Sequence, residues 1–177
     1  MQSFSRRALL SLPLIVAFAP AAASADDNTV TLKLRDGDVV IRLRPDLAPK
    51  HVAQIKKLVQ MKFYDGIVFH RVIPGFMAQT GDPTGTGTGG SKLPNIPGEF
   101  SKAHFKRGTV GMARSAEKNS ANSQFFICFA DQPSLDGNYT IWGEVVSGMD
   151  NVDAIKAGEP PADPDKIISM RLGSDAK

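Results

Sequence analysis

The chain has 177 residues, 42% of them hydrophobic and 22% charged, which is the balance of a soluble globular protein with one ordinary domain. Its formal net charge is +3 and it has no long cluster of lysine or arginine, so we expect no nucleic-acid partner. The single cysteine, Cys128, excludes an intrachain disulfide, and its bulky apolar neighbours predict a buried core residue rather than a reactive thiol.

The first 25 residues predict a secretory signal peptide. Arg6-Arg7 supplies a positive start, residues 8–19 form an apolar run too short to span a bilayer comfortably, and small residues form a cleavage site that ends at Ala25. We expect a periplasmic or secreted domain of residues 26–177, with a formal charge of +1 and no stable membrane span after cleavage. The arginine pair also fits a twin-arginine signal, so the export route stays open, and an uncleaved anchor is the alternative.

Residues 29–43 predict a β-hairpin, and residues 49–61 predict a helix. Apolar and polar residues alternate through both arms of the hairpin, and Asp36-Gly37 between them is a type I′ turn signal. In the helix, Pro49 suits the first turn and the apolar residues recur on one stripe.

Two apolar runs, residues 67–73 and 76–80, predict a second pair of strands around a Pro74-Gly75 turn. Arg71 is unusual on such a strand, because arginine keeps its proton and is costly to bury unless a partner or ligand meets its donors. One interpretation is an amphipathic hairpin whose arginine reaches solvent. The aromatic and apolar residues around it favour the other interpretation, an arginine held for a ligand.

A long loop rich in Gly, Thr and Pro follows over residues 81–100. Residues 85–90 match the G-x-G-x-x-G pattern of dinucleotide sites, but Pro94 and Pro97 forbid the helix that such a site requires. We therefore interpret this segment as a flexible loop that borders a cleft.

The rest of the chain predicts four more strands and a short helix. The strands are expected over residues 109–114, 124–130, 140–146 and 167–172, and the helix around residues 149–155. The second of these strands is apolar enough to be buried on both faces. About eight strands and two helices, without an internal repeat or second domain, are typical of a β-sandwich or β-barrel.

Three stretches together carry a family resemblance. Residues 69–79 read FHRVIPGFMAQ, residues 123–127 read SQFFI, and Leu135-Asp136-Gly137 follows. In order and spacing they resemble the cyclophilin-type peptidyl-prolyl cis–trans isomerases, and the likeness runs from about residue 29 to residue 172. The resemblance implies a mainly β fold, a closed eight-stranded antiparallel β-barrel capped by two α-helices. It also implies a monomer that acts on proline-containing polypeptides without a cofactor.

The resemblance, together with the chemistry of prolyl rotation, also assigns site residues. Rotation needs an apolar pocket for the proline ring and a donor aimed at the prolyl nitrogen. Arg71 is the expected donor, and Gln79 is expected to hold Arg71 or the substrate carbonyl, so both are predicted to be catalytic. The predicted substrate-binding residues are Phe76, Met77, Ala113, Arg114, Gln124, Phe126, Leu135 and Tyr139.

Three positions depart from the well-known eukaryotic members of the family. Ser134 stands where those have a tryptophan that contacts cyclosporin, so we expect weak inhibition by cyclosporin. Tyr139 stands in place of a histidine on the pocket rim, and its flat ring and hydroxyl should preserve proline binding. Arg114 stands in place of an asparagine, as in bacterial members, which bears on substrate preference.

We expect an exported isomerase that assists the folding of envelope or secreted proteins. The alternative is a binding module that holds proline-containing segments as a chaperone or scaffold with little catalysis. The intact set of Arg71, Phe76, Gln79 and Phe126 favours the enzyme, because a scaffold without activity has no need of the arginine. His51, His70 and His104 show no metal-ligand spacing, and His70 is expected to be structural because strand alternation turns it away from Arg71.

Overall fold

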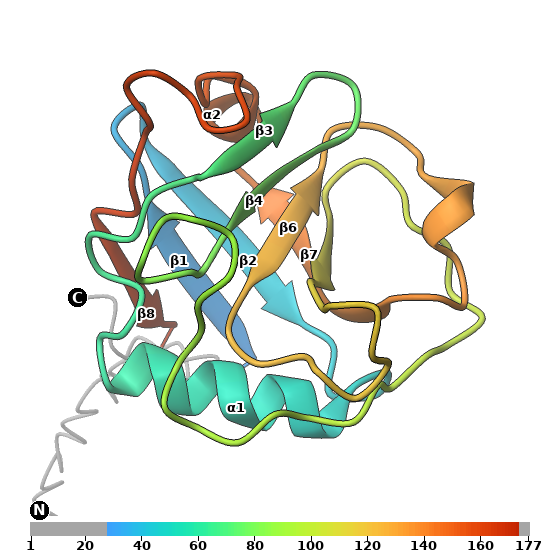
Figure 1. The fold of residues 1–177 in the computed structure, drawn as a ribbon. Coiled ribbons are helices and arrows are strands. Elements are labelled where there is room, and N and C mark those ends of the chain that lie inside the picture. The colour runs from blue at the N-terminus through green and yellow to red at the C-terminus, as the bar shows by residue number, and fades with distance from the viewer. Residues whose placement is uncertain (1–27, 174–177) are drawn as a thin grey trace, which may run out of the picture.

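The computed structural model describes residues 28–173, so the predicted signal peptide lies outside the described residues. Eight strands form one antiparallel sheet, accompanied by two α-helices and one 3₁₀ helix (Figure 1). The strands are β1 (Thr29–Lys33), β2 (Asp38–Leu43), β3 (Arg71–Ile73), β4 (Met77–Thr80), β5 (Thr109–Met112), β6 (Phe125–Cys128), β7 (Thr140–Ser147) and β8 (Ser169–Leu172). The helices are α1 (Pro49–Gln60), α2 (Met149–Asp153) and the 3₁₀ helix η1 (Pro133–Leu135). The predicted mainly β fold is confirmed.

Local sequence signals account for the first elements. The β1–β2 hairpin turns where predicted, and the Leu34 N–H donates to the Gly37 carbonyl at 3.0 Å. Helix α1 buries its apolar stripe, but no side chain of its own caps its N-terminus. Instead Glu99, from the long loop, accepts the backbone N–H groups of Lys50 and His51 at 3.1 and 3.0 Å. The carboxylate of Glu99, distant in sequence, therefore accepts backbone N–H groups that have no partner within the first turn of a helix.

The strands follow the order β3-β4-β6-β5-β7-β2-β1-β8, and the sheet curls into a half-barrel. The prediction of a closed barrel is wrong, because within residues 28–173 no ladder joins the edge strands β3 and β8. Only Arg71–Ile73 of the longer predicted run forms a strand. Two isolated bridges, Val68 with Lys166 and Val72 with Gly158, span the gap instead. We call this gap the seam.

The two faces of the curled sheet carry separate apolar clusters. On β6, Phe125 belongs to the main core, whereas Phe126 and Cys128 belong to a second cluster on the other face. Large rings fill the core, where Phe125 lies edge-on to Tyr64 and Trp142 at centroid distances of 5.5 and 5.4 Å. Cys128 is buried as predicted, and burial raises the pKa of its thiol to about 12. Strand β6 is therefore buried on both faces, as predicted.

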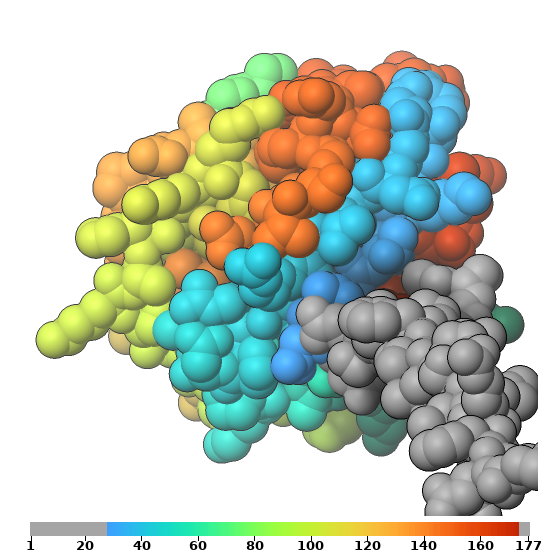
Figure 2. All heavy atoms as spheres, turned by 180° about the vertical axis from the view of Figure 1, so that it is seen from behind, coloured from blue at the N-terminus to red at the C-terminus, as the bar shows by residue number. Residues whose placement is uncertain are grey.

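The helices lie at opposite ends of the half-barrel, with α1 across one end and α2 at the other (Figure 1). Seen from behind, the side chains of β2, β7 and α1 adjoin in one surface (Figure 2), in keeping with the pairing of β2 and β7. Within the described part of the chain, no helix has both the length and the apolar character that a bilayer span requires.

Candidate active site

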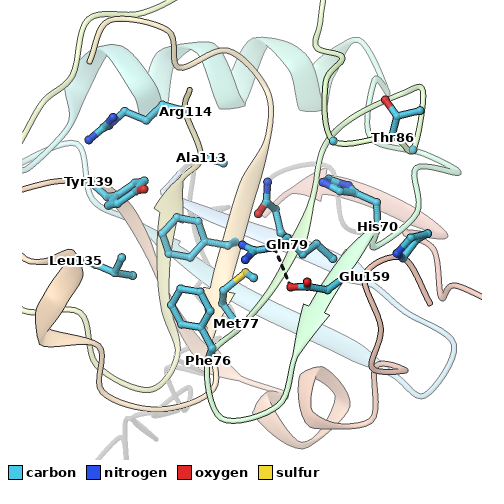
Figure 3. Close-up of a pocket in the computed structure, with 15 residues that line it drawn as sticks. His70, Phe76, Met77, Gln79, Thr86, Ala113, Arg114, Leu135, Tyr139 and Glu159 are labelled. Carbon is cyan, nitrogen blue, oxygen red and sulfur yellow. Dashed lines mark hydrogen bonds and ion pairs between the residues drawn. The ribbon is translucent and has the colours of Figure 1, made fainter. Parts of the chain in front are cut away.

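A pocket of about 640 Å³ lies beside β4 and β6, on the face of the sheet away from the core (Figure 3). The residues predicted for the site border this pocket, with Gln124 as the exception. They are Arg71, Phe76, Met77, Gln79, Ala113, Arg114, Phe126, Leu135 and Tyr139. Gln124 borders an adjoining pocket of about 400 Å³, which shares Gln79, Gly87, Ala113 and Arg114 with the first.

The register of the strands explains why these residues meet. Arg71 of β3 pairs with Gln79 of β4, Gln79 pairs with Phe126 of β6, and Phe126 pairs with Gly111 of β5. Directly opposed residues on antiparallel strands project from the same face, so the four form one row across the sheet. Gly111 leaves the space that the Phe126 ring fills, since a Cβ there would lie 2.4 Å from the ring carbon Cζ.

Part of the pocket wall is aromatic and apolar. Phe126 forms its floor, stacked on Phe105 at 5.9 Å between ring centroids and edge-on to Tyr139 at 5.8 Å. Phe76 comes from the β3–β4 turn, and Leu135 is brought in by η1 (Figure 3). The η1 helix was not predicted, although the Leu-Asp-Gly stretch it carries was.

The guanidinium of Arg71 stands at the rim of the pocket with 42% of its side chain exposed. Its Nε donates to Oε1 of Glu159 at 3.1 Å, the dashed line in Figure 3. Its Cζ lies 6.0 Å from the centroid of the Phe76 ring. Within residues 28–173 the guanidinium makes no other hydrogen bond. The guanidinium of Arg71 is therefore held at Nε, while its two terminal nitrogens are left without a hydrogen-bond partner among the described residues.

Gln79 is hydrogen-bonded to Gln124, a partner that the sequence did not suggest, and its predicted contact with the substrate carbonyl stays a prediction. Its Nε2 donates to Oε1 of Gln124 at 2.9 Å, and within residues 28–173 no hydrogen bond joins Gln79 to Arg71. The Nε2 of Gln124 in turn donates to the carbonyls of Gly87 and Gly89 at 2.9 and 2.8 Å. This chain of hydrogen bonds ties β4 and the segment before β6 to the glycine-rich loop.

The glycine-rich loop is organised around the buried carboxylate of Asp82. This group accepts the backbone N–H groups of Thr84, Gly87 and Gly89 at 2.8, 2.7 and 3.0 Å, and the Thr84 hydroxyl as well. Burial alone would raise the pKa of Asp82, but these hydrogen bonds outweigh it and lower that pKa to about 2. The prediction that the loop borders the cleft is confirmed, because its residues 85–87 line the pocket.

Arg114 braces the opposite rim. Its Nη2 and Nε donate to the Asn138 carbonyl at 2.9 and 3.2 Å, and its Nη1 donates to the Ser115 carbonyl at 2.9 Å. Its Cζ lies 4.7 Å from the centroid of the Tyr139 ring, within the range of a cation–π contact. Arg114 therefore fixes the Tyr139 ring that forms one wall of the pocket.

Sequence reasoning missed several residues of the pocket. His70, Glu159 and Pro160 also line it. The expectation that His70 turns away from Arg71 is wrong, because His70 precedes β3 and does not follow strand alternation. Burial lowers the pKa of His70, with Asp82 acting in the opposite sense. No motif marks Glu159, since its place depends on a pairing with a distant part of the chain.

The family model described as "Cyclophilin type peptidyl-prolyl cis-trans isomerase/CLD" matches residues 29–172. The chain belongs to this family, the cyclophilins. A Brucella suis protein named "Probable peptidyl-prolyl cis-trans isomerase" is 55% identical, over 99% of this cyclophilin and 100% of its own length. A "Peptidyl-prolyl cis-trans isomerase" of Synechococcus elongatus is 40% identical, over 88% of this chain and 97% of its own.

Solved structures of cyclophilins have the same fold. A cyclophilin from Hirschia baltica matches with a TM-score of 0.78 and 31% identity, over 85% of this chain and 76% of that one. One from Cryptosporidium parvum, solved in the presence of the dipeptide Ala-Pro, matches with a TM-score of 0.76 and 29% identity, over 81% and 98% of the two chains. The family match and these relatives show that this cyclophilin is a peptidyl-prolyl cis–trans isomerase.

Proposed function

We propose that this pocket seats the proline ring of an extended polypeptide while Arg71 donates a hydrogen bond to the prolyl nitrogen. The observation that carries the proposal is the half-exposed guanidinium of Arg71 at the rim of a pocket walled by Phe76, Met77, Phe126 and Leu135. The apolar wall of the pocket suits the pyrrolidine ring. The guanidinium suits the prolyl nitrogen, which becomes more basic during rotation.

The reaction needs no nucleophile and no cofactor. Rotation about an X-Pro bond has a barrier of roughly 18–20 kcal/mol, because it breaks amide resonance. As the bond twists, the lone pair becomes localised on the prolyl nitrogen and accepts a hydrogen bond. Arg71 then binds the twisted amide better than the planar one, which is the condition for catalysis.

Arg71 supplies only part of the expected rate enhancement. Acceleration from about one event per minute to ~10³ per second is roughly 10⁵-fold, or about 7 kcal/mol. One hydrogen bond from a charged group contributes about 1.5–3 kcal/mol. The apolar floor formed by Phe126 supplies the rest by orienting the ring and excluding water.

The substrate chain is proposed to lie along the edge that continues β5, beside the pocket. The Ala113 N–H donates to the Gln124 carbonyl at 2.9 Å, so this amide is already paired within the sheet. The backbone of Arg114, one residue further, is left to pair with an extended substrate in the manner of an added strand. The adjoining pocket at Gln124 then takes a neighbouring side chain of the substrate.

The activity test is a cis–trans assay on a short X-Pro peptide with the purified protein and its Arg71→Ala variant. We expect fast isomerisation that falls by most of its value in the variant but remains above the uncatalysed rate, because the pocket persists. Turnover at the wild-type rate in Arg71→Ala would refute the donor assignment. Peptide binding without catalysis in either protein would favour the chaperone or scaffold.

The proposed setting is the folding of exported proteins. This part of the proposal rests on the signal-peptide pattern of residues 1–25 and the cleavage site that ends at Ala25. Expression of the full chain in a bacterial host, followed by cell fractionation and mass measurement, tests it. We expect a periplasmic or secreted product that begins at Asp26; a full-length product in the cytoplasm would contradict this setting.

A further inference from the structure

Arg71 depends on an acidic residue that no sequence motif marks. Its Nε contacts Oε1 of Glu159 at 3.1 Å, and the two side chains are 42% and 51% exposed. We propose that Glu159 is the positioning residue of Arg71, holding Nε so that the two terminal nitrogens are presented to the substrate. This inference rests on the proposed role of Arg71 as the donor to the prolyl nitrogen.

Backbone pairing across the seam places the two residues opposite each other. Val72 and Gly158 exchange two hydrogen bonds, N–H to carbonyl in each direction, at 2.8 and 2.9 Å. One step along an antiparallel pairing, Arg71 falls opposite Glu159. That step is a non-hydrogen-bonded pair, the kind in which opposed side chains come closest. The ion pair therefore follows from backbone register and does not depend on the chance meeting of two long side chains.

The residues next to Glu159 restrict the conformation of its backbone. Gly158 has φ of +150°, and a Cβ on it would lie 2.5 Å from Cα of Pro161. Glycine is therefore required there, and Pro160 and Pro161 restrict the chain that follows. Glu159, labelled in Figure 3, lines the pocket, and so does Pro160. A carboxylate carried on such a segment is presented to Arg71 with little freedom to move away.

The other neighbour of Arg71 in the row does not compete for this role. Gln79 lies opposite Arg71 on β4, but among the described residues no hydrogen bond joins the two side chains, and Nε2 of Gln79 donates to Gln124. Glu159 thus provides the hydrogen bond that orients the guanidinium, and Phe76 flanks it at 6.0 Å. A flexible arginine held on one edge loses less freedom when it meets the substrate, which lowers the barrier to rotation.

The experiment compares Glu159→Ala and Glu159→Gln with wild type, with Arg71→Ala and with a matched control. The control is Asp153→Ala, which removes the acid from an ion pair with Arg107 outside the pocket. The side chains of Arg107 and Asp153 are 45% and 42% exposed, so this pair is about as exposed as the one tested. Exchange spectroscopy by NMR on an X-Pro peptide gives kcat and KM without a coupling protease. The Nε–Hε signal of Arg71 reports its hydrogen bond independently of activity.

We expect kcat of Glu159→Ala to fall about tenfold with little change in KM, and Arg71 Hε to exchange faster with water. Glu159→Gln should be partly rescued, because its amide oxygen still accepts from Nε, and Asp153→Ala should match wild type. Wild-type kcat and an unchanged Hε signal in both Glu159 variants, with Arg71→Ala impaired, would overturn this inference and leave the proposed function standing. Full activity in Arg71→Ala would instead overturn both.

Discussion

At the scale of single residues, the pocket depends on the absence of a side chain at Gly111 as much as on the ring of Phe126. The Phe126 ring forms the pocket floor only because its cross-strand partner has no side chain. A Cβ on Gly111 would lie 2.4 Å from Cζ of Phe126 and 2.7 Å from Cε1 of Phe105. The ring of Phe126 would have to tilt into the space meant for the proline.

We therefore predict that Gly111→Ala raises KM for an X-Pro peptide several-fold and destabilises the fold by about 1–3 kcal/mol. Gly143→Ala is the control, because its Cβ would clash with Cγ2 of Ile41 at 2.7 Å in the main core, away from the pocket. Kinetics and urea unfolding of both variants check the prediction. An unchanged KM in Gly111→Ala would show that the ring does not set the pocket floor.

Ser134 is the second residue with a testable consequence. It lies exposed in η1, next to the pocket residue Leu135, where the resemblance places a tryptophan that contacts cyclosporin in eukaryotic members. We predict weak inhibition of the wild-type protein and at least tenfold tighter inhibition of Ser134→Trp, because a large aromatic contact is restored. Inhibition titrations of the two proteins test this. Nanomolar inhibition of the wild type would contradict it.

At the scale of elements, the glycine-rich loop derives its shape from one carboxylate. The pKa of Asp82 is about 2, against an ordinary value of 3.8. Because the folded pKa is lowered, Asp82 contributes stability that is fully present above about pH 4 and is lost as the pH falls toward 2. A lowering of this size corresponds to about 2 kcal/mol.

We predict that Asp82→Asn is less stable than wild type by about 2 kcal/mol at neutral pH and that the difference shrinks as the pH falls to 2. The variant should also bind peptide more weakly, since Gly85, Thr86 and Gly87 line the pocket. Urea unfolding of both proteins between pH 7 and pH 2 measures the difference. A constant difference over that range would mean that the carboxylate's charge is not what organises the loop.

At the scale of the whole molecule, the seam is closed by isolated bridges and separate backbone hydrogen bonds, not by a continuous ladder. Val72 and Gly158 form an isolated bridge, whereas Val110 and Ile127 lie opposite each other within the β5–β6 ladder. Local opening takes place where few backbone hydrogen bonds support one another. The seam also carries Arg71, the proposed donor, so stability and the proposed catalysis meet there.

We predict that the amides of Val72 and Gly158 exchange with solvent at least tenfold faster than those of Val110 and Ile127, because they open without global unfolding. Native-state hydrogen exchange followed by NMR gives the four rates in one experiment. Seam amides protected to the level of global unfolding would show that the half-barrel behaves as if it were closed.

Much of the fold and of the pocket wall could be predicted from the sequence. The alternation of apolar and polar residues predicted where strands lie. The motifs that contain Arg71 and Phe126 predicted site residues, and the strand register places those residues side by side. Alternation cannot tell a continuous ladder from an isolated bridge, which is why the seam was missed. Glu159 was missed for a related reason, since its pairing with the segment at Arg71 is set by where α2 returns the chain.

The position of the pocket outside the core decides which substrates this cyclophilin is able to reach. The site is a recess in the outer surface of the sheet, and the core behind it is filled with side chains such as Phe125 and Trp142. A polypeptide can therefore lie across the site with both of its ends running off into solvent. No free terminus has to be threaded into the proposed site, so prolines in the middle of a long unfolded polypeptide are open to the enzyme while either flank is still folding.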